Sequence, residues 1–261
     1  MEINNYIDIY EIYNKKLTID IINDIKNNNI KKIKFGYEFN DNIDALSDLE
    51  IEELTFTYNF NKKINKYPIN LKKIIFGYLF NQDINNLPET IEFLSVGNNF
   101  DYDLNNLPNN LKELWIIGNY NKIIDKLPRN ILKLMIVGKF NQPLNNLPEN
   151  LKFLHIQSEK FNHSLNNLPP TLEVLLINGI FNKPLYNLPS SLIELYLEYN
   201  YNHPLDNLPP NLKILKLGYY FNQSINTLPQ SLEELYIFGI FNKYTDNLPN
   251  NLKIKKIIHL S

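Results

Sequence analysis

The sequence predicts a strand-dominated α/β fold: a right-handed curved solenoid of about eleven to twelve coils, with a parallel β-sheet on its concave face. Three observations predict it. A phrase of 20–21 residues occurs eleven times, short segments alternate apolar and polar residues, and glycine and proline recur at fixed places in the phrase. Self-similarity at a short period is typical of one supersecondary unit stacked on copies of itself.

The phrase is marked by an aromatic residue followed by Asn or, once, Asp. Its spacing is 20 residues, with 21 at the first step and again between Phe140 and Phe161. The aromatic positions are Phe39, Phe60, Phe80, Phe100, Tyr120, Phe140, Phe161, Phe181, Tyr201, Phe221 and Phe241. We therefore expect one continuous array over residues 30–261.

Each phrase contains one short strand. In the copy Leu111–Pro128, Leu114 and Ile116 alternate with Glu113, Trp115 and Ile117. This period of two predicts a strand that turns the first pair toward the core and the second set outward.

Glycine and proline predict how the chain leaves the strand and returns. All eight glycines fall within two residues of a strand's last inward residue, where a sharp turn with positive φ is expected. Ten of the fifteen prolines share one later position, which forbids a regular helix. The convex side should therefore be extended, polyproline-like or a single 3₁₀ turn.

The Asn after the aromatic residue predicts a structural ladder. A buried amide can satisfy both backbone donors and backbone acceptors, and copies about 4.8 Å apart can bond to one another. The ladder would contain Asn61, Asn81, Asn121, Asn141, Asn162, Asn182, Asn202 and Asn222.

These motifs resemble a known family. The strand pattern Leu-x-x-Leu-x-Ile, followed by Asn and Leu-Pro, resembles a short leucine-rich repeat, and the segment Phe80–Pro88 resembles the FNIP repeat subfamily. The resemblance covers about residues 30–260. It implies a protein-interaction module without catalytic residues, of a type found in amoebae and their large DNA viruses. Some members carry an F-box that recruits ubiquitin ligase machinery.

The two ends should differ from the repeats. Residues 1–29 are interpreted as a cap with one helix, because Leu17–Ile25 has apolar residues at helical spacing and Thr18 or Asp20 suits an N-cap. The segment is too short for an F-box and lacks its Leu-Pro-rich start, so a ubiquitin-ligase subunit is the less favoured function.

At the other end Lys255 stands where an inward Leu is expected, and charge on an edge strand discourages pairing. The alternative is that Ile257, Ile258 and Leu260 bind a partner, such as a second copy in a homodimer.

Composition excludes several classes of function. The net charge of -2 and scattered Lys and Arg argue against nucleic acid. No run approaches the roughly 18 apolar residues of a membrane span, residues 1–5 do not resemble a signal peptide, and no cysteine is present. We expect a cytoplasmic protein, in the host cytoplasm or the virion if its source is viral.

No motif predicts catalysis, a cofactor or a metal site, so we do not expect an enzyme. The histidines are His155, His163, His203 and His259. Two of them, His163 and His203, share a repeat position but should lie about 10 Å apart, too far to bind one metal ion.

Function is therefore sought in the outward residues of the strands. Between Phe93 and Tyr196 these are apolar and aromatic, edged by Glu and Lys, which is the composition of a protein-binding surface. The candidate residues are Phe93, Trp115, Ile117, Met135, Val137, Phe153, His155, Val174, Leu176 and Tyr196. The alternative is that the curved sheet shields them and that Glu113 and Lys133 pair across strands.

Two functions follow from this reading. The first is an adaptor that binds a protein partner, such as a host protein, on the concave face. The second is a structural or virion component that associates with itself. A rival binding site is the convex band of Asn pairs, whose monotony suits structure better than recognition.

Overall fold

The computed structural model describes residues 9–12 and 15–258, which belong to two compact units, residues 1–120 and 121–261. Unit 1 contains β1 (Tyr10–Ile12), α1 (Ile19–Asn27), β2 (Lys32–Phe35), the 3₁₀ helix η1 (Asp44–Leu46), β3 (Glu53–Phe56), β4 (Lys73–Ile75), β5 (Phe93–Val96) and β6 (Glu113–Gly118). Unit 2 contains β7 (Lys133–Gly138), β8 (Phe153–Ser158), β9 (Val174–Gly179), β10 (Glu194–Leu197), β11 (Ile214–Leu217), β12 (Glu234–Phe238) and β13 (Ile254–Ile258).

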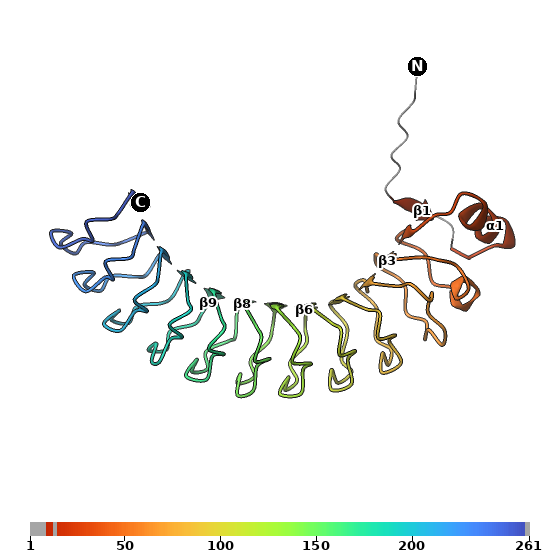
Figure 1. Cartoon of the computed structure of the whole chain (residues 1–261), viewed down its shortest axis with the longest axis horizontal. Helices are drawn as coiled ribbons and strands as arrows, with labels where there is room; N and C mark the ends of the chain where they lie inside the picture. The colour runs from red at the N-terminus through yellow and green to blue at the C-terminus, as the bar shows by residue number, and fades with distance from the viewer. Residues whose placement is uncertain (1–8, 13–14, 259–261) are drawn as a thin grey trace, which may run out of the picture. The chain divides into compact units, whose positions relative to one another are not determined.

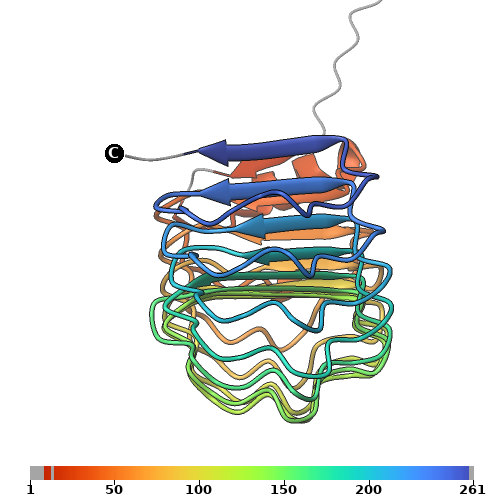
Figure 2. The same cartoon turned by 90° about the vertical axis from the view of Figure 1, so that its left-hand side faces the viewer.

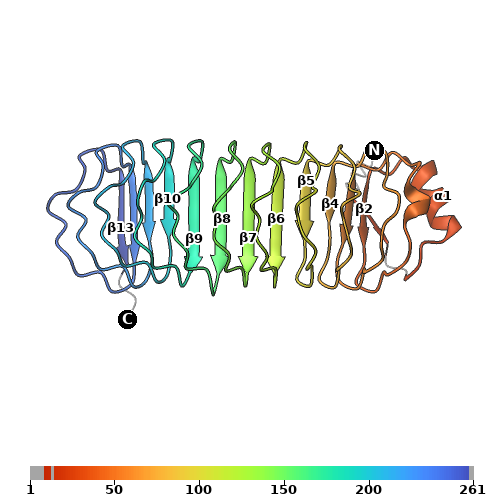
Figure 3. The same cartoon turned by 90° about the horizontal axis from the view of Figure 1, so that it is seen from below.

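Within each unit the strands are parallel and pair in sequence order, which confirms the predicted strand-dominated β-solenoid. Equivalent residues of successive repeats face one another; for example, Leu134 pairs with Leu154, and Leu154 pairs with Leu175. Figures 1 and 3 show the strands of each unit side by side, with the loops on the opposite side of the coils. Every side chain in a repeat therefore lies next to its own counterpart in the neighbouring coil.

The core consists of stacked copies of the same apolar side chains. Inward residues such as Leu154 and Leu175 are fully buried, and so is the repeated aromatic residue. Successive rings lie 6.1 Å apart between Phe161 and Phe181, and 5.9 Å apart between Phe60 and Phe80. Figure 2 shows the strands at one side of the coils and the return loops at the other side. Each buried ring contributes roughly 1.5–3 kcal/mol to stability.

The prolines open a turn that leads into each strand. The carbonyl of Pro148 accepts from the N–H of Leu151 at 3.1 Å, and the other nine prolines at this position make the same bond three residues on. Of the three conformations expected for this side of the coil, a single turn is the one present at these prolines. The coil that contains η1 has no proline, and there the 3₁₀ helix takes the place of the turn.

The glycines serve two different purposes. Gly239, like three other glycines, has a positive φ of 108°, as predicted for a sharp turn. At Gly77, by contrast, φ is not positive, and a Cβ atom would overlap the carbonyl oxygen of Thr57 in the preceding coil. Close stacking of coils, rather than backbone conformation, requires glycine at that position.

The asparagine ladder exists, but its chemistry differs from the prediction. In most coils the side-chain Oδ1 of this Asn accepts from the backbone N–H of its counterpart in the next coil, at 3.0 Å from Asn202 to Asn182 and 2.9 Å from Asn222 to Asn202. These residues are half-buried or exposed rather than buried. A carbonyl oxygen at this distance is well placed for the backbone donor of the next coil, so amide-to-amide bonding is not needed.

Residues 15–29 include the expected helix. Thr18 is the N-cap of α1, and its Oγ1 accepts from the N–H of Ile21 at 3.4 Å. The cap segment also contains a strand, β1, which pairs with β2 and whose Tyr10 hydroxyl donates to Asp24 on the helix. At the far end of unit 2, Lys255 on β13 faces Leu235 and is exposed, while Leu260 and His259 lie outside the described residues.

The ladder can be tested at Asn202, whose Oδ1 accepts both the Asn222 N–H and the Gln223 side-chain amide. We expect Asn202→Ala to lower the free energy of unfolding by about 1–3 kcal/mol, because two donors lose their acceptor. Asn202→Asp retains a carboxylate oxygen and should cost clearly less. Urea denaturation of both variants compares them, and equal losses would show that the acceptor is unimportant.

Candidate functional site

The candidate site is the outward face of the sheet, where the middle outward residues of each strand form a column. In unit 2 this column runs through Met135, His155, Leu176, Tyr196, Lys216, Tyr236 and Lys256. In unit 1 it runs through Lys34, Thr55, Ile75, Ser95 and Trp115. The register brings neighbours in each column into contact, because strands lie about 4.8 Å apart.

In unit 1 an aromatic cluster lies on β5 and β6. The Trp115 ring meets the Phe93 ring edge-on, with centroids 5.1 Å apart, and its indole N–H donates to Glu113 at 2.8 Å. Trp115 pairs with Ser95, which is only 2% exposed although it points outward. Lys73 lies over the other end of the cluster, with its Nζ 5.2 Å from the Phe93 centroid. The tryptophan is thus held in one orientation on the sheet surface.

Ile117 follows on β6, on the same face and half-buried. In unit 2 the predicted residues Met135, Val137, Phe153, His155, Val174 and Leu176 occupy β7–β9 and are likewise half-buried. The sheet register places them in adjacent rows, such as Phe153 beside Val174 and His155 beside Leu176. Within unit 2 these side chains shield one another partly from water, and they still form an apolar face.

The apolar face of unit 2 continues into a Tyr–Lys–Tyr arrangement. The Lys216 Nζ lies 4.6 Å from the Tyr196 ring centroid and 5.1 Å from that of Tyr236. The Tyr196 hydroxyl donates to Glu194 at 2.7 Å, and the Tyr236 hydroxyl donates to Glu234 at 3.0 Å. Burial, with the bond to Glu194, raises the pKa of the Tyr196 phenol, so it remains a donor at neutral pH.

Sequence reasoning stopped the patch at Tyr196 and so missed Lys216 and Tyr236 as its continuation. The signal was present, because Glu194-Leu195-Tyr196 recurs as Glu234-Leu235-Tyr236. Residues i and i+2 of a strand share a face, so this pattern predicts both carboxylate–phenol bonds.

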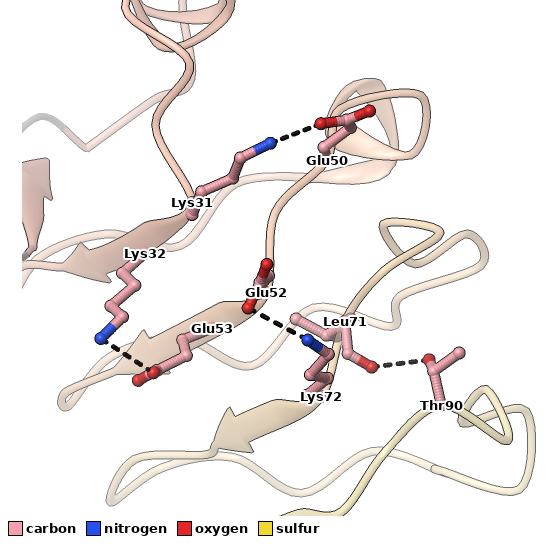
Figure 4. A network of polar contacts seen from close by, with 8 residues as sticks. All are labelled: Lys31, Lys32, Glu50, Glu52, Glu53, Leu71, Lys72 and Thr90. Atoms are coloured by element: carbon pink, nitrogen blue, oxygen red, sulfur yellow. Dashed lines mark hydrogen bonds and ion pairs between the residues drawn. The ribbon is translucent and has the colours of Figure 1, made fainter.

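Charges of alternating sign border the sheet where the strands begin. In unit 1 the Nζ of Lys72 lies 3.3 Å from Glu52, and Glu53 contacts both Lys32 at 3.3 Å and Lys73 at 3.4 Å; Figure 4 shows the first two of these pairs. In unit 2 Lys152 pairs with Glu173 at 2.8 Å. Exposed pairs of this kind contribute at most about 1 kcal/mol each.

Two residues of unit 2 interrupt this charged border. Leu132 and Ile193 stand at repeat positions that elsewhere carry Lys or Glu, and each is 36% exposed. They precede β7, the first strand of the apolar face, and β10, the strand that follows that face. The apolar surface of unit 2 therefore extends to the border, which sequence reasoning did not include.

His155 is the polar exception on the apolar face. Its Nε2 is buried and has no hydrogen-bond partner among the described residues. Burial lowers the pKa of the imidazole, and Glu198 raises it to a smaller extent. The ring is therefore neutral at neutral pH, with one nitrogen desolvated.

The other described histidines have structural contacts. The Nε2 atoms of His163 and His203 lie 3.0 and 3.1 Å from the carbonyl oxygens of Asn141 and Asn182. The same repeat position carries Gln82, Gln142 and Gln223, whose side-chain amides contact the Asn of the preceding coil. Within residues 9–12 and 15–258, no cluster of three or more metal-binding side chains is found.

Comparison with known proteins identifies the type of repeat. Residues 201–239 match the FNIP repeat family model. CroV588, a protein of the giant virus CroV described as a novel circular LRR protein, is 31% identical and superposes with a TM-score of 0.84 over 96% of this chain. TLR13, solved as a complex with ssRNA13, is 17% identical with a TM-score of 0.62 over 88% of this chain and shares the fold.

The chain spans 40% of the length of each of these two structures. No curated protein matches it. In the part of the chain that the structure describes, the one α-helix is too short to cross a bilayer.

The desolvated His155 predicts a pH dependence. The pKa of His155 is lower in the folded protein than in the unfolded chain, so the unfolded chain takes up a proton more readily. The free energy of unfolding is therefore highest above the ordinary histidine pKa of about 6.5 and decreases as the pH falls below it. We expect His155→Leu to flatten the pH dependence of the free energy of unfolding between about pH 7 and 5. Urea titrations of the unaltered chain and of His155→Leu at both pH values measure this, and an equal pH dependence in the two would contradict the prediction.

Proposed function

We propose that this chain, an FNIP-repeat protein of the leucine-rich-repeat superfamily, is a non-catalytic scaffold that binds a protein partner on the outward face of its sheet. The observation that carries the proposal is the apolar face of β7–β9 in unit 2. The side chains on a sheet face that is in contact with water are ordinarily polar. Here three adjacent strands instead present Met135, Leu176 and Phe153.

The rest of the surface fits the anatomy of a protein interface. Apolar and aromatic residues are edged by Glu194 and Glu234 in unit 2 and by Glu113 in unit 1. Interfaces combine such a core with a polar rim, and tryptophan, tyrosine and arginine dominate their binding energy. The indole and phenol side chains are already oriented by carboxylates, which reduces the entropy lost on binding.

The partner is a protein of the cell in which the chain works. We place that encounter in the cytoplasm, which is the host cytoplasm if the source is viral, as CroV588 makes plausible. The charge balance of the chain and its paired Lys–Glu border argue against nucleic acid as the partner.

Two substitutions test the binding surface, one in each unit. We expect Trp115→Ala and Tyr196→Ala each to lower the recovery of a stoichiometric partner at least tenfold in affinity purification from native cells, because hot-spot residues carry at least about 1.4 kcal/mol each. The melting temperature should fall by less than about 5 °C, since both side chains are only half-buried.

The matched controls are Tyr102→Ala in unit 1 and Tyr244→Ala in unit 2, both exposed aromatic residues away from the strands. They should retain the partner. A large loss of stability in Trp115→Ala would identify a core residue instead, and unchanged recovery in both test variants would contradict the proposed surface.

The second candidate function is a self-associating structural or virion component. It is favoured by β13, which pairs with β12 along one edge and has Ile254 42% exposed, with Ile257 and Ile258 half-buried. If a second copy covers this strand, light scattering should give the mass of a dimer, and Ile257→Lys with Ile258→Lys should return it to a monomer. A monomeric mass of the unaltered chain at high concentration would exclude this association.

A further inference from the structure

One coil of unit 2 departs from the repeat on the side opposite the sheet. Its sequence reads Leu185-Tyr186-Asn187, where the first residue after Leu or Ile is Asn or Asp in the other coils with this motif, as in Leu144-Asn145-Asn146 and Leu205-Asp206-Asn207. Leu144 is 5% exposed, whereas Leu185 is only half-buried and Tyr186 is 55% exposed. Asn187 has a φ of 56°, in the left-handed region that few residues other than glycine adopt.

The altered turn leaves a hollow against the next coil. The second Asn of a coil can tie its turn to the coil before it, as Asn146 Nδ2 does by donating to the Asp125 carbonyl at 2.7 Å. Among the described residues, Asn187 at the same repeat position makes no such bond. Between the altered turn and residues 203–208 a space of about 170 Å³ remains. This is below the roughly 300–1,000 Å³ of sites for cofactors and drug-sized ligands, so it suits a single side chain.

The lining combines an apolar wall with hydrogen-bond acceptors. Leu185, Leu188 and Leu205 supply the apolar part. Asp206 supplies a carboxylate, and no Lys or Arg lines the hollow. The Nε2 of His203 donates to the Asn182 carbonyl, since a carbonyl can only accept.

From this chemistry we propose that the hollow receives a basic side chain, arginine or lysine, of a protein partner. The aliphatic stem would lie against the leucines, and the cationic end would meet Asp206 and the exposed ring of Tyr186. The site is on the loop side of unit 2 and is independent of the sheet face, so it would be a second contact for a partner. Its affinity for one side chain is low, because Asp206 is exposed to solvent.

The test uses the full chain labelled with ¹⁵N and titrated with N-acetyl-arginine amide, followed by amide chemical shifts. We expect saturating shifts confined to residues 184–188 and 203–208. The neutral isostere N-acetyl-citrulline amide should bind at least about threefold more weakly, which is the ratio an exposed ion pair supports. The binding of the arginine compound should weaken further at high salt.

Three variants separate the hollow from general attraction of a cation. Asp206→Asn should reduce the affinity to that of citrulline, and Tyr186→Asn, which restores the ordinary repeat letter, should abolish the shifts by closing the hollow. The control Asp246→Asn removes a carboxylate from the same repeat position two coils further on and should change nothing. Equal binding of arginine and citrulline, shifts scattered over the surface, or equal losses in Asp206→Asn and Asp246→Asn would each overturn the proposal.

Discussion

The in-register stacking of identical coils is the constraint on which the rest of the structure depends. The phrase length brings each residue back to the same place one strand spacing further along, so a side chain packs against its own counterpart. This geometry favours stacked aromatic rings, hydrogen bonds from a backbone N–H to the Asn of the preceding coil, and ion pairs between Lys and Glu of neighbouring coils. It excludes a Cβ atom at Gly77, because the backbone of the neighbouring coil is too close. The residues that recur in every repeat are those that allow the coils to stack in register.

The same stacking explains why the outward residues within a unit form surfaces rather than isolated points. One apolar residue on a strand is common and has no functional meaning. When Phe153 and Val174 occupy paired positions on adjacent strands, the two form one continuous patch. Alternation within each strand also orients polar groups: a carboxylate two residues before Trp115 or Tyr196 lies on the same face and accepts a hydrogen bond from the ring. Such a surface is rigid before any partner arrives.

Residues that differ from the repeat weaken the packing between neighbouring coils. The turn of Tyr186 and Asn187 lacks, among the described residues, the bond that Asn146 makes to its preceding coil, and a hollow lies beside this turn. Ser95 leaves room that the Trp115 ring covers. His155 introduces a nitrogen that neighbouring apolar side chains cannot satisfy. At each of these positions the residue present packs less well than the usual residue of the repeat would. A functional role is therefore expected there.

The sequence by itself determined the parallel strands, their inward and outward residues, the absence of a regular helix at the ten repeated prolines and the outward apolar positions, because all of these follow from local period and residue type. It could not decide how Asn182 bonds to the next coil, why Gly77 must be glycine, or that Lys216 lies over the rings of both Tyr196 and Tyr236. Those depend on distances between residues some twenty positions apart. Only the tertiary structure sets such distances, since stacking brings together atoms that the chain itself keeps apart.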